Sequence, residues 1–546
     1  MFSEKERRQR VYWILFVIFA IGAFVVRAHD FGKYPADNIS DEALTAVDAM
    51  AIVENGTDHY GTSFPVYFEG WGSSQQSTLY GYILAVFLKL FGVSTFVVRL
   101  PMLSFSLIGI AALTWMAWLV LSRQVALFVL AFAAINPWHI MASRWGLDAN
   151  IFPHFLVIGF AFLFYAIKKQ KKWALCVSFF TFGISIYGYG VAYVYLPFFM
   201  ISIFLLLYFT KTFHFMELLS AGIVFFAISW PIILILAINY FQLPTITIGK
   251  MTIQFFEKTT RAGDILFFSN NILEQLRINF MAVWETVALQ KLDAFWNQLP
   301  NIGSYYLISW PFTLVGIAEI LELIKNERRQ RRWTPNIVCL MILLSGIISS
   351  LIAGLLINKI NVGRINHIYY LIIFVTAYGI YEVFTKKRNW GYLIFICYGV
   401  YFAFFCYRYY YSEDRTVVNY TFDKGLKEAM HQAFEIPGKI CISQYQFHRS
   451  FNTTEISTIY LLRLPYRYYS GQMSDEELAA SAYLLPYEEK FHYFNDLEAV
   501  FADQGENCTY VVNVKERDFF DLELFRVKTD DFFSVAIPQN KVFQNP

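Results

Sequence analysis

The chain contains repeated runs of about 20 apolar residues, and this feature limits its fold more than any other. A helix of that length crosses the hydrocarbon core of a bilayer with its backbone hydrogen bonds satisfied internally. Of the 546 residues, 57% are hydrophobic and only 16% are charged. The sequence therefore predicts an α-helical polytopic membrane protein. We predict about eleven spans, at residues 11–29, 96–121, 125–141, 151–167, 173–191, 194–210, 215–238, 302–324, 336–357, 367–384 and 391–411.

The short apolar segment Leu79–Phe91 decides the topology. It is shorter than a spanning helix requires, so we predict a re-entrant or interfacial helix. The basic start Lys5–Arg10 indicates a cytoplasmic N-terminus before a retained first span. The basic clusters Lys168–Lys172, Lys325–Arg332 and Lys386–Arg388 then also fall on the cytoplasmic side, as the positive-inside rule requires.

Charged residues return after the last apolar run, which predicts a domain boundary near Ser412. We expect a transmembrane domain over residues 1–411, with a long outer loop at 30–95, and a soluble extracytoplasmic α/β domain over 412–546. Its pattern predicts helices at Asp423–Phe434 and Asp475–Leu484, and strands at Lys439–Ser443 and Thr509–Val514. Cys441 and Cys508 can pair in an oxidising compartment, but spacing alone leaves this disulfide open.

Charge and motifs argue against several soluble functions. A net charge of +2 is too small to favour a nucleic-acid partner. The sequence carries no P-loop, dinucleotide fingerprint or G-x-S-x-G elbow in a suitable context. The polar residues gather in segments predicted to lie outside, which points to chemistry at the membrane surface.

Asp41 and Glu42 form an adjacent acid pair just beyond the first span. Ser40 is placed to cap a helix that begins here, and acids in a first turn complement the helix dipole. On that interpretation the pair is only a solvated helix start. On the alternative, one carboxylate is a general base that removes a proton from an acceptor hydroxyl as it attacks an activated carbon.

His59, Tyr60 and Trp71 lie farther along the same outer loop, among Gly and Pro turns. Aromatic faces suit the apolar faces of sugar rings, so these residues are candidates for substrate binding. Aromatic belts at a membrane interface have the same composition, and interface anchoring is the alternative.

Arg144 and Asp148 follow the third predicted span and are four residues apart. A helical turn would place them on one face as an ion pair. The alternative has Arg144 contacting a phosphate or ordering the acid pair, with Asp148 beside the reaction centre.

Arg364 begins a later span from the outer side, with Asn361, Asn366 and His367 around it. It either binds a lipid phosphate or extends to lipid headgroups. Further candidate cations in the outer stretch 240–300 are Lys250, Lys258 and Arg261.

A divalent metal site in the outer loops also remains open. No pair of residues has diagnostic ligand spacing, and the sequence does not choose between a hard cation and zinc. The candidate ligands are Asp41, Glu42, His59, Glu69 and His139.

Taken in order, these features resemble a known family of membrane enzymes. The acid pair Asp41-Glu42, the loop Gly56–Pro65, the segments Phe91-Gly92 and Val98–Pro101, the Ser143-Arg144 turn with Asp148, and Arg364 before a late span carry the resemblance. The sequence is similar to the protein O-mannosyltransferases and the lipid A aminoarabinose transferases of the glycosyltransferase C (GT-C) superfamily. The similarity extends over roughly the first 390 residues.

This resemblance implies an inverting glycosyltransferase whose sugar donor is carried on polyprenyl phosphate and used on the outer face. Asp41 is then the leading catalytic base, Glu42 and Asp148 are its neighbours, and Arg144 and Arg364 are candidates for the donor phosphate. The chain lacks a recognisable large luminal β-trefoil domain between spans. A cell-envelope acceptor, whether glycan, lipid or protein, is therefore expected.

Two other classes of membrane protein are alternatives to a glycosyltransferase. A transporter or lipid flippase would place ionisable residues or broken helices near the bilayer midplane, often in repeated halves. Here the charges lie at the outer ends of the spans, and no repeat is visible. A noncatalytic receptor or assembly protein would not require so many spans for anchoring.

Overall fold

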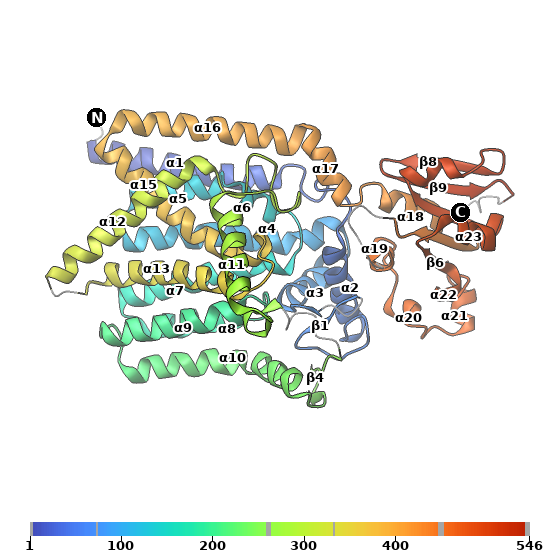
Figure 1. The fold of residues 1–546 in the computed structure, drawn as a ribbon, viewed down its shortest axis with the longest axis horizontal. Helices are drawn as coiled ribbons and strands as arrows, with labels where there is room; N and C mark the ends of the chain where they lie inside the picture. The colour runs from blue at the N-terminus through green and yellow to red at the C-terminus, as the bar shows by residue number, and fades with distance from the viewer. Residues whose placement is uncertain (1–3, 72–74, 258–263, 331–332, 446–452, 541–546) are drawn as a thin grey trace.

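The protein consists of a helical bundle beside a small sheet domain (Figure 1). The computed structural model describes residues 4–71, 75–257, 264–330, 333–445 and 453–540. The N-terminus lies at the end of the bundle far from the sheet domain.

Nine of the described helices are long and apolar enough to cross a membrane. They are α1 (Glu4–Ala28), α4 (Thr95–Val120), α7 (Asp148–Lys169), α9 (Ala192–Phe209), α10 (Phe215–Phe241), α12 (Trp310–Arg329), α13 (Pro335–Leu356), α15 (Tyr369–Lys386) and α16 (Arg388–Tyr411). The apolar helices α5 (Arg123–Ala134) and α8 (Lys172–Ser185) run in the same bundle but have only 12 and 14 residues. Helix length therefore supports nine spans, and the count of eleven stays a prediction.

Glycine allows two of the long helices to approach closely. A Cβ at Gly316 of α12 would lie 2.0 Å from the carbonyl oxygen of Val375, and one at Gly379 of α15 would lie 2.0 Å from that of Phe312. Small residues at a helix crossing let the backbones pack without intervening side chains, as is common inside membranes. A larger side chain at either position would force α12 and α15 apart.

The basic clusters gather at one end of the bundle. Figure 1 shows the N-terminus at the same end as the turns that join α7 to α8, α9 to α10, α12 to α13 and α15 to α16. These turns contain or adjoin the clusters that the sequence analysis placed on the cytoplasmic side. The opposite end carries the long polar segments and the sheet domain.

Short elements build that opposite end. They are α2 (Ser40–Asn55), β1 (Phe68–Glu69), β2 (Gln75–Gln76), α3 (Leu79–Phe91), α6 (Pro137–Ala142), β3 (Ile246–Ile248), β4 (Met251–Ile253), η3 (Leu266–Phe268), α11 (Ile272–Val283), η4 (Trp284–Ala288), η5 (Leu307–Ser309), α14 (Val362–Ile365) and η6 (Asn366–Ile368). Helix α3 has the bounds of the segment predicted not to cross, and it packs against α2. Ser40 is the first residue of α2 rather than its cap, since the N-cap is Ile39, which makes no side-chain cap.

The C-terminal part is a mixed sheet with helices around it. Its helices are α17 (Glu413–Thr421), α18 (Leu426–Phe434), α19 (Thr453–Leu461), α20 (Tyr466–Tyr469), α21 (Asp475–Ala479), α22 (Tyr487–Lys490), α23 (Leu497–Gln504), η7 (Gly505–Asn507) and η8 (Val514–Phe519). The strand order is β6-β5-β7-β9-β8, made of β5 (Lys439–Ser443), β6 (Phe491–Phe494), β7 (Cys508–Asn513), β8 (Phe525–Asp530) and β9 (Phe533–Pro538). The pairs β5·β6 and β5·β7 are parallel, while β7·β9 and β8·β9 are antiparallel.

The predicted elements of this domain are mostly present with shifted ends. Strand β5 has the predicted bounds, whereas β7 begins and ends one residue earlier than predicted. Helix α18 begins only at Leu426, because Asp423 and Gly425 before it have positive φ angles of 50° and 93°. Helix α21 is shorter than predicted and ends at Ala479.

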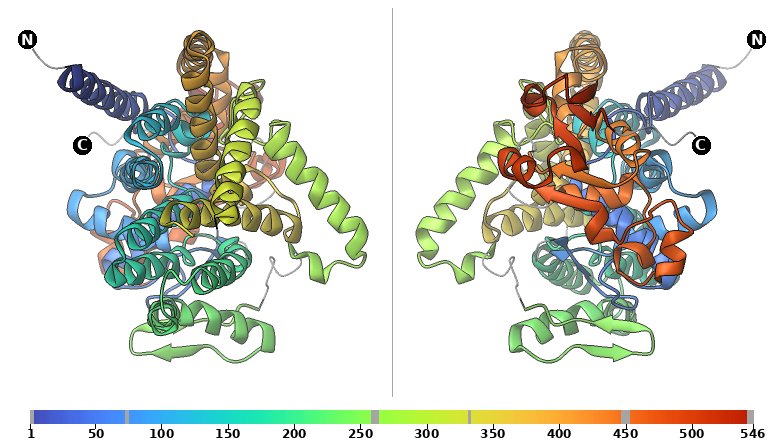
Figure 2. Two further views of the ribbon diagram at one scale, coloured as in Figure 1. Left: turned by 90° about the vertical axis from the view of Figure 1, so that its left-hand side faces the viewer. Right: turned by 90° about the vertical axis from the view of Figure 1, so that its right-hand side faces the viewer.

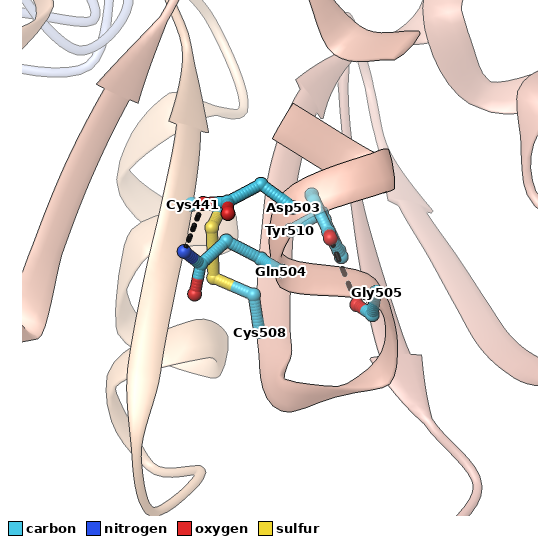
Figure 3. The surroundings of a disulfide bond; sticks show 6 residues. All are labelled: Cys441, Asp503, Gln504, Gly505, Cys508 and Tyr510. Carbon is cyan, nitrogen blue, oxygen red and sulfur yellow. Dashed lines mark hydrogen bonds between the residues drawn. A yellow bond between two sulfur atoms is a disulfide. The ribbon is translucent and has the colours of Figure 1, made fainter. Parts of the chain in front are cut away.

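Cys441 and Cys508 form a disulfide, which settles the pairing that the sequence left open. The bond joins the neighbouring strands β5 and β7, with 5.9 Å between the two Cα atoms (Figure 3). It closes a loop of 67 residues in sequence separation. A cross-link of this length limits the unfolded chain and stabilises the sheet domain.

The sheet domain is attached directly to the outer loop. Both Gly425 and Lys427 donate their backbone N–H to Oδ2 of Asp37, at 3.0 and 3.2 Å. At the other end of α2, the N–H of Tyr466 donates to Oε2 of Glu54 at 2.9 Å. Helix α19 also packs on α2. Figure 2 shows the sheet domain lying against this end of the bundle.

Candidate functional site

The two acids at the start of α2 have different environments. Glu42 is fully buried, whereas Asp41 is exposed. Successive residues of an α-helix point about 100° apart, so adjacent side chains cannot face the same surroundings. Only Asp41 is therefore placed to meet a molecule from solution.

Glu42 is held by a buried bidentate ion pair. Nε and Nη2 of Arg99, on α4, donate to its two carboxylate oxygens at 2.8 and 2.7 Å. The backbone N–H of Gly146 donates to Oε1 at 2.7 Å. This geometry replaces the prediction that Glu42 is a catalytic neighbour of Asp41, because its carboxylate is fully engaged in the fold.

Arg99 also fixes the loop that leads into α2. Its guanidinium donates to the carbonyls of Pro35 at 2.6 Å and Ala36 at 3.0 Å. A single side chain thus holds the residues before Asp41 and the residue after it. We infer that Arg99 and Glu42 position Asp41.

The strand β2 connects Asp41 to a second acid and to a cavity. The side-chain amide of Gln76 donates to the carbonyl of Asp41 at 3.2 Å. The next residue, Ser77, donates its N–H to Oδ2 of the buried Asp148 at 3.2 Å. The preceding residue, Gln75, lines the cavity. The adjacent residues Gln76 and Ser77 thus contact Asp41 and Asp148, and the role of Asp148 stays a prediction.

The cavity has a volume of about 530 Å³ and is lined mainly by aromatic and aliphatic side chains. The residues that form it are Tyr67, Gln75, Tyr189, Gly190, Val191, Tyr193, Val194, Ile235, Leu236, Ala237, Asn239, Tyr240, Phe241, Phe256, Asp264, Ile265, Ile357 and Arg364. Its α10 wall includes Leu236, Tyr240 and Phe241, which are 46%, 71% and 66% exposed. The cavity is thus bordered by a surface of α10 that a bilayer would cover.

Among the described lining residues, the charged side chains are Asp264 and Arg364, which form a pair. Nη2 of Arg364 donates to Oδ2 of Asp264 at 2.8 Å, and Nη1 donates to the carbonyl of Asn358 at 2.6 Å. Arg364 is about one fifth exposed. An apolar cavity with one guanidinium suits an amphipathic ligand that ends in an anion.

Arg144 does not reach this cavity. It is fully buried, and it donates to the backbone carbonyls of Arg27 at 2.6 Å, His29 at 2.7 Å and Tyr34 at 2.7 Å. Its guanidinium also packs on the ring of Tyr410. Among the described residues Arg144 forms no ion pair with Asp148 but holds the outer end of α1, and its contact with a phosphate stays a prediction.

Of the three remaining predicted cations, the structure describes only Lys250, which does not line the cavity. Lys250 is exposed at the turn between β3 and β4, where its carbonyl accepts a hydrogen bond from Ser63 at 3.0 Å. Lys258 and Arg261 lie outside the described residues.

The predicted aromatic group forms a second cluster beside α2. His59 stacks on Trp71 with the ring centres 5.2 Å apart, and Tyr60 stacks on Trp71 at 6.1 Å. Nδ1 of His59 lies 2.6 Å from Oδ1 of Asp48, a buried residue two turns along α2 from Asp41. Nε2 of His59 is buried and has no hydrogen-bond partner in the part of the chain that the structure describes. The three residues thus form one cluster with Asp48, and their role in substrate binding stays a prediction.

His59 should make the stability of this loop depend on pH. Burial alone would lower the pKa of the imidazolium, but the nearby Asp48 carboxylate outweighs burial and raises it above its ordinary 6.5. A raised pKa in the folded state stabilises the protein fully below pH 6.5, and that contribution is lost as the pH rises through the folded pKa. The neighbouring Asp58 loses its proton at a lower pH than His59 does, because burial and Asp48 raise the pKa of Asp58 only to about 6.

We expect the melting temperature of the wild type, relative to that of His59→Gln, to fall as the pH rises above 6.5. The glutamine fills similar space but does not titrate, so it is the matched control. Differential scanning fluorimetry in detergent across neutral and alkaline pH measures this difference. A difference that stays constant with pH would show that His59 is not charged in the fold.

A metal site does not emerge from the candidate ligands. Among the residues that the structure describes, no three His, Cys, Asp or Glu side chains could together hold a metal ion. His139 lies deep in the bundle, where its Nδ1 is 3.1 Å from Nε of Arg27. The metal requirement that the sequence left open therefore gains no support from this geometry.

Sequence reasoning missed three residues of this region. Arg99 stood in a segment that carried the family resemblance, but no sequence signal paired it with Glu42, 57 residues away. Asp264 was missed because its partner Arg364 is 100 residues distant. Asp48 could have been found, since its helical spacing from Asp41 places both on one face of α2.

Comparisons with known proteins agree on the fold. Neither a protein-family model nor a curated protein matches this sequence. ArnT from Cupriavidus metallidurans in the apo state is similar in structure, with a TM-score of 0.54 and 13% identity over 97% of this chain and 98% of that one. The structure of ArnT from the same organism bound to undecaprenyl phosphate gives a TM-score of 0.51 and 12% identity, over 96% and 97% of the two chains.

An archaeal enzyme gives a similar result. The oligosaccharyltransferase of Archaeoglobus fulgidus, in complex with Zn and sulfate, has a TM-score of 0.52 and 13% identity over 97% of this chain and 74% of that one. The likeness covers nearly the whole chain, including the part that the sequence resemblance did not reach. This protein has the fold of ArnT and of the archaeal oligosaccharyltransferase.

Proposed function

We propose that this protein is an inverting glycosyltransferase that moves a sugar from a polyprenyl-phosphate donor to a cell-envelope acceptor. The observation that carries this proposal is the apolar cavity with Arg364 in its lining, and a β2 residue, Gln76, that donates to the backbone carbonyl of Asp41, whose side chain is exposed. A prenyl tail suits the apolar walls and the lipid-facing side of α10. The phosphate suits the guanidinium.

The proposed reaction is a single displacement. The carboxylate of Asp41 accepts a proton from an acceptor hydroxyl, whose oxygen forms a bond to the anomeric carbon of the donor. The bond between that carbon and the phosphate oxygen breaks, and polyprenyl phosphate leaves with the electron pair. Arg364 stabilises the charge on the leaving phosphate. Attack from the side opposite the phosphate inverts the anomeric carbon.

The similar solved structures support the choice of donor class. One ArnT structure is bound to undecaprenyl phosphate, and one structure of the archaeal oligosaccharyltransferase contains a dolichol-phosphate with an inhibitory peptide. A lipid phosphate is therefore a reasonable ligand for the same fold here. The acceptor class, whether glycan, lipid or protein, is a proposal from the sequence.

We also propose that the N-terminus is cytoplasmic and that the sheet domain, residues 412–546, is extracytoplasmic. The basic turns lie at the end of the bundle that holds the N-terminus, which the positive-inside rule assigns to the cytoplasm. The Cys441–Cys508 disulfide in the sheet domain suits an oxidising compartment. The site would then work on the outer face.

The direct test is sugar transfer by the purified full chain. A panel of radiolabelled polyprenyl-phosphate sugars is supplied with an envelope extract as acceptor, and labelled product and released polyprenyl phosphate are both measured. We expect at least one donor to be consumed. A folded protein that consumes none of them would contradict the proposal.

Arg364→Ala should chiefly weaken use of the donor. Loss of a charge-assisted hydrogen bond to phosphate costs about 1.5–3 kcal/mol, so kcat/KM for the donor should fall by about 10- to 100-fold. Initial rates against donor concentration measure this. The matched control is Lys359→Ala, because Lys359 also approaches Asp264, at 3.6 Å, but is 82% exposed. Equal effects of the two substitutions would remove the special role of Arg364.

One observation favours the alternative of a transporter or flippase. Inside the bundle, Arg27 contacts His139, and the hydroxyl of Tyr370 lies 2.7 Å from both His139 and His154. Buried ionisable groups in spans often mark a transport path. Arg27, however, also donates to the carbonyls of Ala133 and Ala134 at 3.0 Å, which ties α1 to α5. Movement of labelled lipid across vesicles without sugar transfer would favour transport.

A further inference from the structure

We infer that α11 is an interfacial helix that lies in the outer leaflet of the membrane, with the lipid surface itself as its partner. Helix α11 belongs to the described segment 264–300, between the long helices α10 and α12. This inference concerns membrane contact and does not depend on the proposed transfer reaction.

The position of α11 matches the level of a membrane surface. It runs across the direction of the long helices, near the end of the bundle that carries the outer loops (Figures 1 and 2). Nδ2 of Asn279 donates to the carbonyl of Leu355, in the last turn of α13, at 2.8 Å. The same group lies 3.0 Å from Oδ1 of Asn358. These bonds fix α11 where a spanning helix leaves the membrane.

Exposed apolar side chains lie on more than one side of α11, since Ile278 and Met281, on the sides away from Ile272, are 49% and 46% exposed. At 3.6 residues per turn, Ile272, Leu276 and Phe280 follow one another along a single side. Leu273 and Trp284 extend that side away from the bundle. All five are exposed, and Leu273 is 80% exposed.

The remaining residues of α11 have different character. Asn279 and Val283 are buried and face α13. Glu274 and Arg277 lie on the side away from the bundle, and the Arg277 side chain is 77% exposed. A helix with a protein-facing edge, exposed apolar side chains over most of its remaining surface and two charged residues suits burial of that surface in a membrane interface.

Lipid, rather than another protein, suits this surface. The exposed apolar side chains of α11 continue the exposed surfaces of the neighbouring spans, which include Tyr240 and Phe241 of α10 and Leu314 of α12. The segment 264–300 contains four carboxylates and two basic residues, for a net charge of −2: Asp264, Glu274, Glu285, Asp293, Arg277 and Lys291. Insertion would therefore depend on apolar burial, with no need for anionic lipid.

This placement has a consequence for the cavity. Asp264 and Ile265, the first described residues of the segment, line the cavity, and Ile265 forms a β-bridge with Ile357. The N–H of Asn358 donates to the carbonyl of Asp264 at 2.7 Å. An α11 held in the interface would keep the charged lining of the cavity at the depth of the lipid headgroups.

Depth-dependent fluorescence quenching tests the inference. The free cysteines Cys176, Cys339, Cys397 and Cys406 are replaced by alanine, and the disulfide is kept. Single cysteines are then introduced as Leu273→Cys, Phe280→Cys and Arg277→Cys, labelled with NBD, and studied in vesicles of neutral phosphatidylcholine. Quenchers are a nitroxide-labelled lipid within the membrane and iodide in the water.

We expect the lipid nitroxide to quench labels at Leu273 and Phe280 at least threefold more than iodide does, and the reverse at Arg277. Two controls calibrate the result: Ile396→Cys on the exposed side of α16, and Leu522→Cys in the sheet domain, which are 64% and 66% exposed. Labels at Leu273 and Phe280 that behave like the one at Leu522 would overturn the inference. Protection from both quenchers that rises with protein density would overturn it too, in favour of a second copy.

Discussion

Asp41→Asn is expected to lower sugar transfer by about 10²- to 10⁴-fold, the usual contribution of a positioned general base. Asparagine keeps the shape of the side chain but does not accept the proton of the acceptor hydroxyl. The carbonyl of Asp41, which accepts from Gln76, is unaffected by the substitution. The melting temperature should therefore stay close to that of the wild type, and transfer rates and melting curves are measured on the same preparation.

The matched control is Glu54→Gln, at the other end of the same helix. Glu54 is also exposed, and glutamine can still accept the hydrogen bond from the N–H of Tyr466. This variant should transfer sugar at the wild-type rate. If Asp41→Asn retained full turnover, the base would have to be sought at Asp148 or Asp48.

Much of the helical bundle could be predicted because spanning helices share one property, an apolar run long enough to cross a bilayer. Apolar runs long enough to cross a bilayer define the spans, and Leu79–Phe91 stood out because it was too short. The same rule fails at α5 and α8, which run with the bundle although their helices have only 12 and 14 residues. Length alone cannot decide whether such helices cross, since neighbouring helices bury their ends.

The site was predictable only in part, because its polar contacts join distant residues. The sequence singled out the acid pair at the start of α2, but it could not tell the exposed Asp41 from the buried Glu42. The sequence did not show that Arg144 is buried and holds three carbonyls, since such an arginine has the same sequence signal as one that faces a ligand. Burial and partners, not residue type, separate these roles.

Substitutions at Glu42 and Arg99 are expected to lower the stability of the protein strongly. Removing one partner of a buried ion pair leaves the other charge without compensation, which costs about 3–5 kcal/mol. Glu42→Gln and Arg99→Met should therefore each lower the melting temperature markedly. The double variant Glu42→Leu/Arg99→Met should lose less than the sum of the single variants, because neither charge remains buried alone.

The two acids can then be separated by comparing activity with folding. Glu42→Gln should lose transfer in proportion to the fraction of unfolded protein, and lowering the assay temperature should recover part of it. Asp41→Asn should remain inactive at every temperature while staying folded. Transfer that disappears in Glu42→Gln at an unchanged melting temperature would contradict the positioning role, because the carboxylate would then act on substrate. An Arg99→Met variant as stable as the wild type would also contradict the positioning role, because the ion pair would then not hold the start of α2 in place.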